Sequence, residues 1–137
     1  MQAPAIGNHG RRVMGHGVDV VDIAEFSRLL SDSALPFLNR YFNVSELAAS
    51  GRGTTQVEKL ASRFAVKEAV LKALGVGWGD GVAFTDVEVT TLPNGALSVK
   101  LHRDLLEIGN ERGVVGWALS TSHTGTVAFA SVIALGY

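Results

Sequence analysis

The chain has 137 residues, of which 47% are hydrophobic, and this length and composition suit one compact domain with a buried core. Twelve basic residues stand against 13 acidic ones, so no overall field favours nucleic acid or an acidic membrane surface as a partner. The absence of cysteine excludes disulfides and thiolate zinc sites. No apolar run approaches the roughly 20 residues of a membrane span. We therefore expect a soluble, cytoplasmic protein.

The first dozen residues lack a regular pattern, and we expect residues 1–13 to form a disordered extension of a single domain over residues 14–137. Residues 13–21 are apolar and predict a strand. Asp22 and Glu25 follow with the spacing of a capping box, which predicts a helix through Leu30.

The middle of the chain is predicted to be helical. Residues 33–50 indicate one or two short helices, in which Asn43 and Glu46 again have capping spacing. Thr55 and Glu58 form the next expected capping box, and a helix of about five turns then runs to residue 74, where a glycine stops it. The glycine-rich segment 75–81 is either a plain loop, which we favour, or a place where a ligand approaches the backbone.

The rest of the chain has a strand pattern. Residues 86–91 and 97–101 alternate at period two around a turn at 93–95, which predicts a hairpin. A surface helix is expected over residues 103–112, followed by strands over 114–122 and 126–135. Together these elements predict an α+β fold in which one long helix packs on a mainly antiparallel sheet.

The long helix carries four charged side chains that form no clean polar stripe: Arg63, Lys67, Glu68 and Lys72. One interpretation is an i,i+4 pair of Glu68 with Lys72, while Arg63 and Lys67 extend to the surface. The other is that all four lie at a cleft, an interface or a core boundary, because a helix that is apolar on nearly all sides is usually buried. In that case each needs a partner.

Asp19 is a second unexplained charge, because aspartate is disfavoured in strands and Asp22 already supplies the helix cap. A buried carboxylate needs a compensating cation. Paired with Glu68 in a chain without cysteine, it suggests a hard, oxygen-preferring ion such as Mg²⁺. From the residues alone, the metal site and a purely structural role are equally open.

A third unusual segment, Ser120-Thr-Ser-His-Thr124, ends an apolar strand. Adjacent residues on a strand point to opposite faces, so His123 does not act as a base for Ser122, and the G-x-S-x-G elbow of many hydrolases is absent. The histidines lack zinc-ligand spacing, and there is no Walker loop. From the residues alone, His123 is either a structural residue or a functional one.

Three segments in this order resemble the holo-acyl-carrier-protein synthases, the short, single-repeat type of phosphopantetheinyl transferase. They are G-V-D-V-V at 17–21, R-F-A-V-K-E-A-V-L-K-A-L-G at 63–75 and S-T-S-H-T at 120–124. Residues 45–47, residues 84–88 and the Asn94-Gly95 turn match as well. The resemblance implies the phosphopantetheinyl transferase fold. It also implies transfer of the 4'-phosphopantetheine arm of coenzyme A to a serine of apo-acyl carrier protein, which releases adenosine 3',5'-bisphosphate and supports fatty acid biosynthesis.

The resemblance also implies roles for individual residues. Asp19 and Glu68 would be the magnesium ligands and, with Lys72, the catalytic residues. The serine proton would go to Glu68, to Asp19 through a metal-bound water, or to Lys67. The family forms homotrimers with active sites between subunits. The residues expected to bind coenzyme A are Arg63, Lys67, Lys72, Asn94, Gly95, His123 and Thr124.

One part of the chain departs from the family pattern, and two other functions stay open. The helix after the first strand, residues 22–30, is where the family is expected to meet its acidic carrier protein, yet it holds two acidic residues, Asp22 and Glu25, and only one basic residue, Arg28; Arg40 or a neighbouring subunit could compensate. The alternatives are a magnesium-dependent hydrolase of nucleotide diphosphates and a noncatalytic module that binds coenzyme A. The sequence does not reveal which carrier protein is modified.

Overall fold

The computed structural model describes residues 10–79 and 81–137, without the side chains of residues 32–37. No helix in this part of the chain is long and apolar enough to cross a membrane. The elements, in chain order, are β1 (Arg12–Asp22), α1 (Ile23–Tyr41), α2 (Val44–Ala49), α3 (Gly53–Leu74), η2 (Phe84–Asp86), β2 (Val87–Thr91), β3 (Leu97–Leu101), α4 (Arg103–Glu111), β4 (Val114–His123) and β5 (Val127–Gly136).

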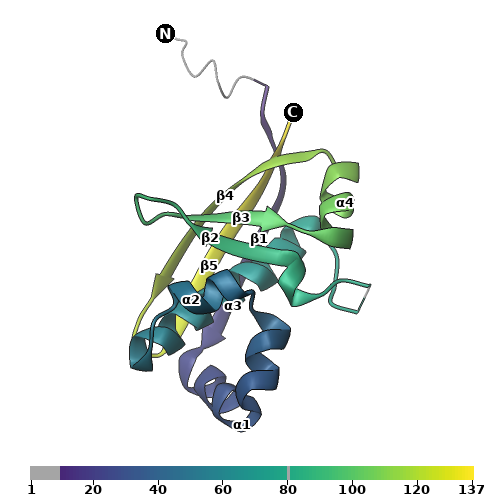
Figure 1. Cartoon of the computed structure of the whole chain (residues 1–137). Coiled ribbons are helices and arrows are strands. Elements are labelled where there is room, and N and C mark those ends of the chain that lie inside the picture. The colour runs from purple at the N-terminus through teal and green to yellow at the C-terminus, as the bar shows by residue number, and fades with distance from the viewer. Residues whose placement is uncertain (1–9, 80) are drawn as a thin grey trace.

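The strands form two antiparallel sheets. One has the order β1-β5-β4, so the first strand of the chain pairs with the last. The other is the β2–β3 hairpin, in which Val89 lies opposite Val99. Figure 1 shows the hairpin crossing in front of the larger sheet. This arrangement confirms the α+β fold predicted from the sequence.

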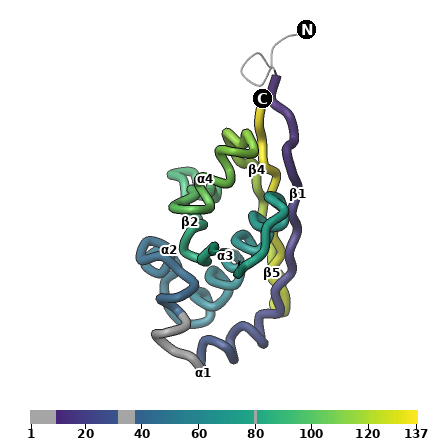
Figure 2. Tube along the Cα trace, turned by 90° about the vertical axis from the view of Figure 1, so that its right-hand side faces the viewer, coloured from purple at the N-terminus to yellow at the C-terminus, as the bar shows by residue number. Residues whose placement is uncertain are grey.

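Helix α3 lies between the three-stranded sheet and the remaining elements (Figure 2). Its approach to β1 depends on two glycines, because a Cβ atom at Gly15 or Gly17 would collide with the carbonyl oxygen of Ala73 or Ala69 in the helix. No side chain therefore separates strand and helix at this crossing. Residues on this strand face, Asp19 included, are held against α3.

The core forms on the side of the sheet that faces α3. In β5, alternate residues are buried and the others point away, as the two-residue period of a strand requires. In Figure 2 no helix covers the opposite face of the sheet. That face carries the exposed hydrophobic side chains Val18 and Val20 of β1 and Phe129 of β5. The buried hydrophobic residues of β5 are Ala128, Ala130, Val132 and Ala134.

Three boundaries are the main differences from the sequence prediction. Strand β1 begins at Arg12, inside the expected extension, and the Arg12 guanidinium donates to the carbonyl oxygen of Tyr137 at the other end of the chain; residues 1–9 lie outside the described part. Helix α1 continues past Leu30, because Phe26, Leu30 and Leu38 pack against a single hydrophobic cluster.

The third difference concerns the start of α3. This helix begins at Gly53, and its N-cap residue Arg52 makes no side-chain capping bond. Thr55 and Glu58 therefore lie inside the helix, and their expected capping box is wrong. At the other end the prediction is confirmed, because Gly75 ends the helix with a left-handed φ of 71°.

Candidate active site

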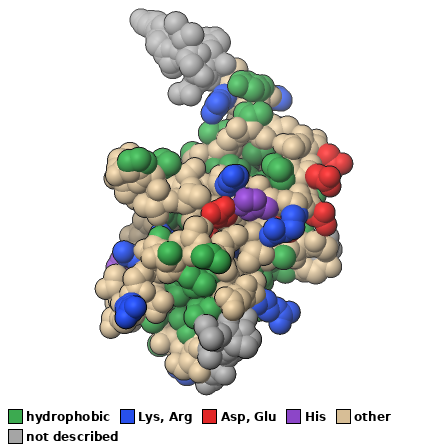
Figure 3. All heavy atoms as spheres, viewed as in Figure 1, with side chains coloured by type: hydrophobic (Ala, Val, Ile, Leu, Met, Phe, Trp, Pro, Cys, Tyr) green, Lys and Arg blue, Asp and Glu red, His purple; other side chains and the backbone are tan. Residues whose placement is uncertain are grey.

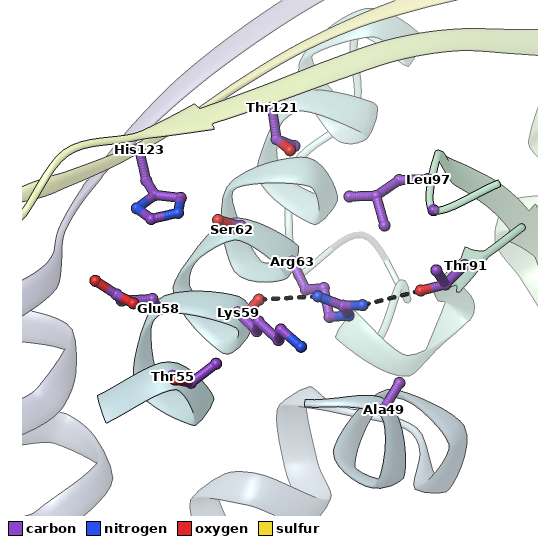
Figure 4. Close-up of a pocket in the computed structure, with 11 residues that line it drawn as sticks. Ala49, Thr55, Glu58, Lys59, Ser62, Arg63, Thr91, Leu97, Thr121 and His123 are labelled. Atoms are coloured by element: carbon purple, nitrogen blue, oxygen red, sulfur yellow. Dashed lines mark hydrogen bonds between the residues drawn. The ribbon is translucent and has the colours of Figure 1, made fainter. Parts of the chain in front are cut away.

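Arg63 lies in a cavity of about 470 Å³, bordered by α3, the β2–β3 turn and the end of β4 (Figure 4). We call this cavity the Arg63 pocket; Gly95 and His123 also line it. His123 extends from β4 toward α3 in the same view. The structure therefore brings together three of the residues predicted to bind coenzyme A.

Only some of the hydrogen-bond donors of the Arg63 side chain have acceptors among the described residues. This side chain is 5% exposed, and its guanidinium donates to the Lys59 carbonyl oxygen at 3.3 Å and to Thr91 Oγ1 at 3.1 Å. Its Nε is buried without a hydrogen-bond partner among the described residues. Burial lowers the pKa of Arg63, and the charge of Glu46 opposes this shift. Arginine keeps its charge in proteins, so this cation suits an anionic ligand.

Asp19 and Glu68 line a second cavity of about 390 Å³, which we call the Asp19 pocket. Asp19 comes from β1 and Glu68 from α3, and the glycine-mediated approach of these elements brings the carboxylates to one cavity. Phe64 lines it as well. The two carboxylates that the sequence singled out, 49 residues apart (68 minus 19), therefore share one pocket.

The partners of these carboxylates decide between the two interpretations of the helix charges. Lys72 Nζ lies 3.1 Å from Asp19 Oδ1 and donates to the Val18 carbonyl oxygen at 3.0 Å. It therefore crosses to β1 instead of forming the i,i+4 pair with Glu68. Glu68 Oε1 accepts a hydrogen bond from Trp78 Nε1 at 3.1 Å.

The surroundings of Glu68 disfavour the charged form of its carboxyl group. Burial raises the pKa of Glu68, and the nearby charge of Asp19 raises it further, while the Trp78 hydrogen bond and the Lys72 charge oppose the shift. A cation between the two carboxylates would relieve their repulsion. This pocket is therefore electrostatically suited to a positive ion.

The donor set fits Mg²⁺. Among residues 10–79 and 81–137 no group of three histidine, aspartate or glutamate side chains gathers as a complete cage. Mg²⁺ does not need one, because it commonly binds through one or two carboxylates together with waters and substrate phosphates. Asp19 and Glu68 supply such a pair of hard oxygen ligands.

Lys67 is placed differently from the sequence expectation. It and Glu46 have fully buried side chains and form an ion pair at 2.9 Å. The ammonium also donates to the carbonyl oxygens of Phe84 at 3.0 Å and Val87 at 2.5 Å. Burial lowers the pKa of Lys67, and Glu46 opposes this shift. We therefore remove Lys67 from the predicted coenzyme ligands and proton acceptors, because its amine is already used inside the protein.

Asn94 and Thr124 use their side chains within their own turns. Asn94 Oδ1 accepts from the Ala96 amide at 3.0 Å. Thr124 Oγ1 accepts from the amides of Thr126 and Val127, each at 3.2 Å. Neither residue lines the Arg63 pocket, and their role in binding coenzyme A stays a prediction.

Two residues of the site were missed in the sequence analysis. Lys59 lines the Arg63 pocket, and its position four residues before Arg63 on the same helix was the available signal. Trp78 reaches Glu68 from the glycine-rich loop, and nothing in the sequence pattern indicated that contact.

A separate charged cluster lies outside both pockets. In Figure 3 acidic, basic and histidine side chains gather near the centre of the face, over the hairpin and the start of α4. Glu88 and His102 lie 2.8 Å apart, and Arg103 pairs with Asp86 at 2.6 Å. These contacts join η2 and β2 to the start of α4, so we assign the cluster a structural role.

Comparison with known proteins places this chain and its fold in a family. A family model described as the 4'-phosphopantetheinyl transferase superfamily matches residues 15–127. The holo-[acyl-carrier-protein] synthase of Solibacter usitatus is 35% identical, over 88% of this chain and 97% of its own length. That of Trichlorobacter lovleyi is 37% identical, over 88% of this chain and 96% of its own.

Solved structures agree with these sequence matches. The Neisseria meningitidis holo-[acyl-carrier-protein] synthase has a TM-score of 0.81 at 28% identity, covering 90% of this chain and 98% of that one. A synthase–coenzyme A complex from Chronobacterium ammoniagenes has a TM-score of 0.77 at 31% identity, covering 90% and 96%. The chain therefore belongs to the 4'-phosphopantetheinyl transferase superfamily and, within it, to the holo-[acyl-carrier-protein] synthases.

Proposed function

We propose that this protein, with Mg²⁺, transfers the 4'-phosphopantetheine arm of coenzyme A to a serine of an apo-acyl carrier protein. The product would be the holo-carrier of cytoplasmic fatty acid biosynthesis. The observation that carries the proposal is the pairing of Asp19 and Glu68 in one pocket, with Lys72 beside Asp19. Two relatives with solved structures are described as complexes with coenzyme A.

In this proposal the bond between the serine oxygen and the β-phosphorus forms as the bond to the adenosine-bearing phosphate breaks. Bound Mg²⁺ would neutralise the charge of the coenzyme's diphosphate. Lys72 holds Asp19 in position and supplies a fixed positive charge near the leaving phosphate. Of the proton acceptors considered, Glu68 and Asp19 remain, because the Lys67 amine is already paired with Glu46.

The Arg63 pocket is proposed to hold the nucleotide end of coenzyme A. Arg63 offers a buried guanidinium whose Nε needs an acceptor, and phosphate oxygens are the acceptors that such a planar fork binds well. His123 and the Gly95 turn lie at the same cavity. The nucleotide phosphates are therefore proposed to contact Arg63 and His123.

The exposed sheet face supports a proposed homotrimer. Val20 is 57% exposed, and Val18 and Phe129 lie beside it on the face that no helix covers. Contiguous exposed apolar surface of this kind is typical of protein interfaces. In the proposed homotrimer the active sites would lie between subunits.

The carrier protein is proposed to dock beside α1, where Arg28 and Arg40 are exposed basic residues. Glu25 lies on the same helix and lines the Asp19 pocket. Because this surface mixes both signs, we expect its cognate carrier to be less acidic where it meets α1 than a carrier that faces a wholly basic helix.

A mass measurement tests the activity. The purified protein is mixed with apo-carrier, coenzyme A and Mg²⁺, and the carrier is weighed before and after the reaction. We expect the carrier to gain one phosphopantetheine arm, located on a serine by peptide mass. Cleavage of coenzyme A without a change in the carrier would instead indicate the hydrolase. Binding of coenzyme A without either reaction would indicate the noncatalytic module.

A further inference from the structure

The loop between α3 and η2 is folded back onto the helix that precedes it. Gly75, Gly79 and Gly81 have φ angles of 71°, 104° and 83°, a region that glycine enters without steric cost. These bends return the chain so that Trp78, at the middle of the loop, is half-buried against the core cluster that contains Leu71 and Leu74.

Aromatic stacking fixes the Trp78 ring. Its centroid lies 3.6 Å from that of Phe84, with 23° between the ring planes. Phe84 in turn stacks on Phe64, with centroids 5.3 Å apart and 16° between the planes. Phe64 also lines the Asp19 pocket. Three stacked rings therefore connect the loop to the wall of the proposed metal site, and they restrict the freedom of the indole.

The fixed indole makes a directed contact with Glu68. Trp78 Nε1 donates to Glu68 Oε1 at 3.1 Å, and an indole nitrogen is only ever a donor. The Trp78 nitrogen therefore cannot serve as a metal ligand. It holds one carboxylate oxygen, and among the described residues the other oxygen of Glu68 has no hydrogen-bond donor. Glu68 would otherwise rotate about three side-chain bonds.

We propose that Trp78 is a positioning residue for the metal site, and that it holds the Glu68 carboxylate in the orientation in which it binds a divalent cation together with Asp19. This inference rests on the proposed function, because it presumes that Glu68 is a metal ligand. A donor on a ligand's oxygen draws some charge away from the metal, but partners that orient a ligand generally raise metal affinity, and their loss costs about 10- to 100-fold.

Trp78→Phe isolates the hydrogen bond, because it keeps an aromatic ring on Phe84 and removes the N–H donor. Mn²⁺ is titrated into the full chain with coenzyme A present and carrier protein absent, and bound metal is measured by electron paramagnetic resonance. We expect the Kd for Mn²⁺ to rise about tenfold. Trp117→Phe, which changes the other tryptophan on β4, is the matched control and should bind Mn²⁺ like the wild type.

Steady-state kinetics should show a change in the Mg²⁺ concentration needed for transfer without a change in kcat. Trp78→Phe should need about tenfold more Mg²⁺ for half-maximal transfer, with kcat at saturating Mg²⁺ close to the wild-type value. A merely structural role would instead lower the melting temperature and the amount of active enzyme without changing the Mg²⁺ midpoint. Unchanged Mn²⁺ affinity in folded Trp78→Phe would overturn the inference.

A second measurement does not depend on the folding of that variant. The chain has two tryptophans, so Trp117→Phe leaves Trp78 as the single indole. Its fluorescence should change saturably as Mg²⁺ is added with coenzyme A, at the midpoint found by calorimetry. Absence of a fluorescence change while calorimetry detects binding would contradict the inference.

The variant Glu68→Gln distinguishes a failure of the proposed metal site from a failure of the proposed role of Trp78. If the wild type binds Mn²⁺, Glu68→Gln does not, and Trp78→Phe binds like the wild type, only the role of Trp78 fails. If Glu68→Gln binds Mn²⁺ as well as the wild type, the proposed metal site fails, and the inference fails with it.

Discussion

At the scale of single residues, Glu46 and Lys67 form the most deeply buried charged pair among the described residues, with both side chains fully enclosed. Glu46 also accepts from the backbone amides of Asn43 at 2.6 Å and Val89 at 2.8 Å. One carboxylate therefore connects the start of α2, the middle of α3 and strand β2. This network holds the helix that carries Arg63 and Glu68.

Removing one partner of this pair should be costly. Glu46→Gln leaves the Lys67 ammonium buried without its counter-charge, and we expect a loss of about 3–5 kcal/mol in the free energy of unfolding, measured by urea denaturation. The double variant Glu46→Leu with Lys67→Met removes both charges and should be more stable than Glu46→Gln. If Glu46→Gln unfolds at the wild-type urea concentration, the pair does not have this structural role.

The residue scale also shows what the sequence could reveal. Asp19 and Glu68 were identified because each had no structural explanation, and the structure places them at one pocket. Lys67 belonged to the same group of unexplained charges, yet its partner Glu46 lay in a segment assigned only a capping role. Sequence spacing predicts which residues share a helix face. It does not predict which distant carboxylate that face will contact.

At the scale of elements, the contact between β1 and α3 places Asp19 beside Glu68, and Gly17 makes the contact possible. Gly17→Ala would push a methyl group into the Ala69 carbonyl oxygen, so we expect a loss of about 1–3 kcal/mol or more in the free energy of unfolding. Gly125→Ala, where the added methyl meets nothing within 4 Å, is the matched control. Equal melting temperatures for the two variants would argue against a tight strand–helix crossing.

A second prediction at this scale concerns pH. The Ser45 hydroxyl donates to Glu88 Oε2 at 2.6 Å, and His102 lies on the other oxygen at 2.8 Å. These contacts lower the pKa of Glu88 below its ordinary value of 4.5, with the Ser45 bond as the largest cause. Because the folded-state pKa is depressed, the stabilisation is complete above the ordinary value and is lost as the pH falls through the folded-state pKa.

Glu88→Gln tests this pH dependence. The wild type should be more stable than the variant at pH 6, and the difference should shrink below about pH 4.5. Urea denaturation of both proteins across this range measures it. If the stability difference instead grows as the pH falls, the pKa of Glu88 is not lowered in the folded state.

Element types were more predictable than their ends. The hairpin, the long helix and the last two strands follow from local periodicity, and the structure confirms them. The continuation of α1 past Leu30 was not predictable, because it depends on packing against Leu60 and Ala61 of α3. The start of α3 was missed because Arg52 and Gly53 replace the usual side-chain cap.

At the scale of the whole molecule, the uncovered sheet face is the feature that a single chain leaves unexplained. If this face assembles the proposed trimer, Val20→Glu should place charges in the interface and yield monomers, measured by analytical ultracentrifugation. Val44→Glu is the matched control, because Val44 is 84% exposed on α2, away from the sheet. Wild-type assembly of Val20→Glu would exclude this face as the interface.

The two-sheet architecture was beyond the reach of the sequence reading. Each strand had a local signature, but the pairing of β1 with β5 joins opposite ends of the chain, and no local pattern encodes such a long-range contact. The element pattern predicted the α+β class, and the resemblance to a known family added the phosphopantetheinyl transferase fold. It did not supply the contact between Trp78 and Glu68, which depends on how this particular loop folds.

The most direct test of the account is the position of the metal. A crystal of the protein grown with coenzyme A and Mn²⁺ would locate the ion by its anomalous scattering. We predict one peak within bonding distance of both the Asp19 and the Glu68 carboxylates, in contact with the coenzyme's diphosphate. A peak bound elsewhere, or a diphosphate held without either carboxylate, would contradict the account.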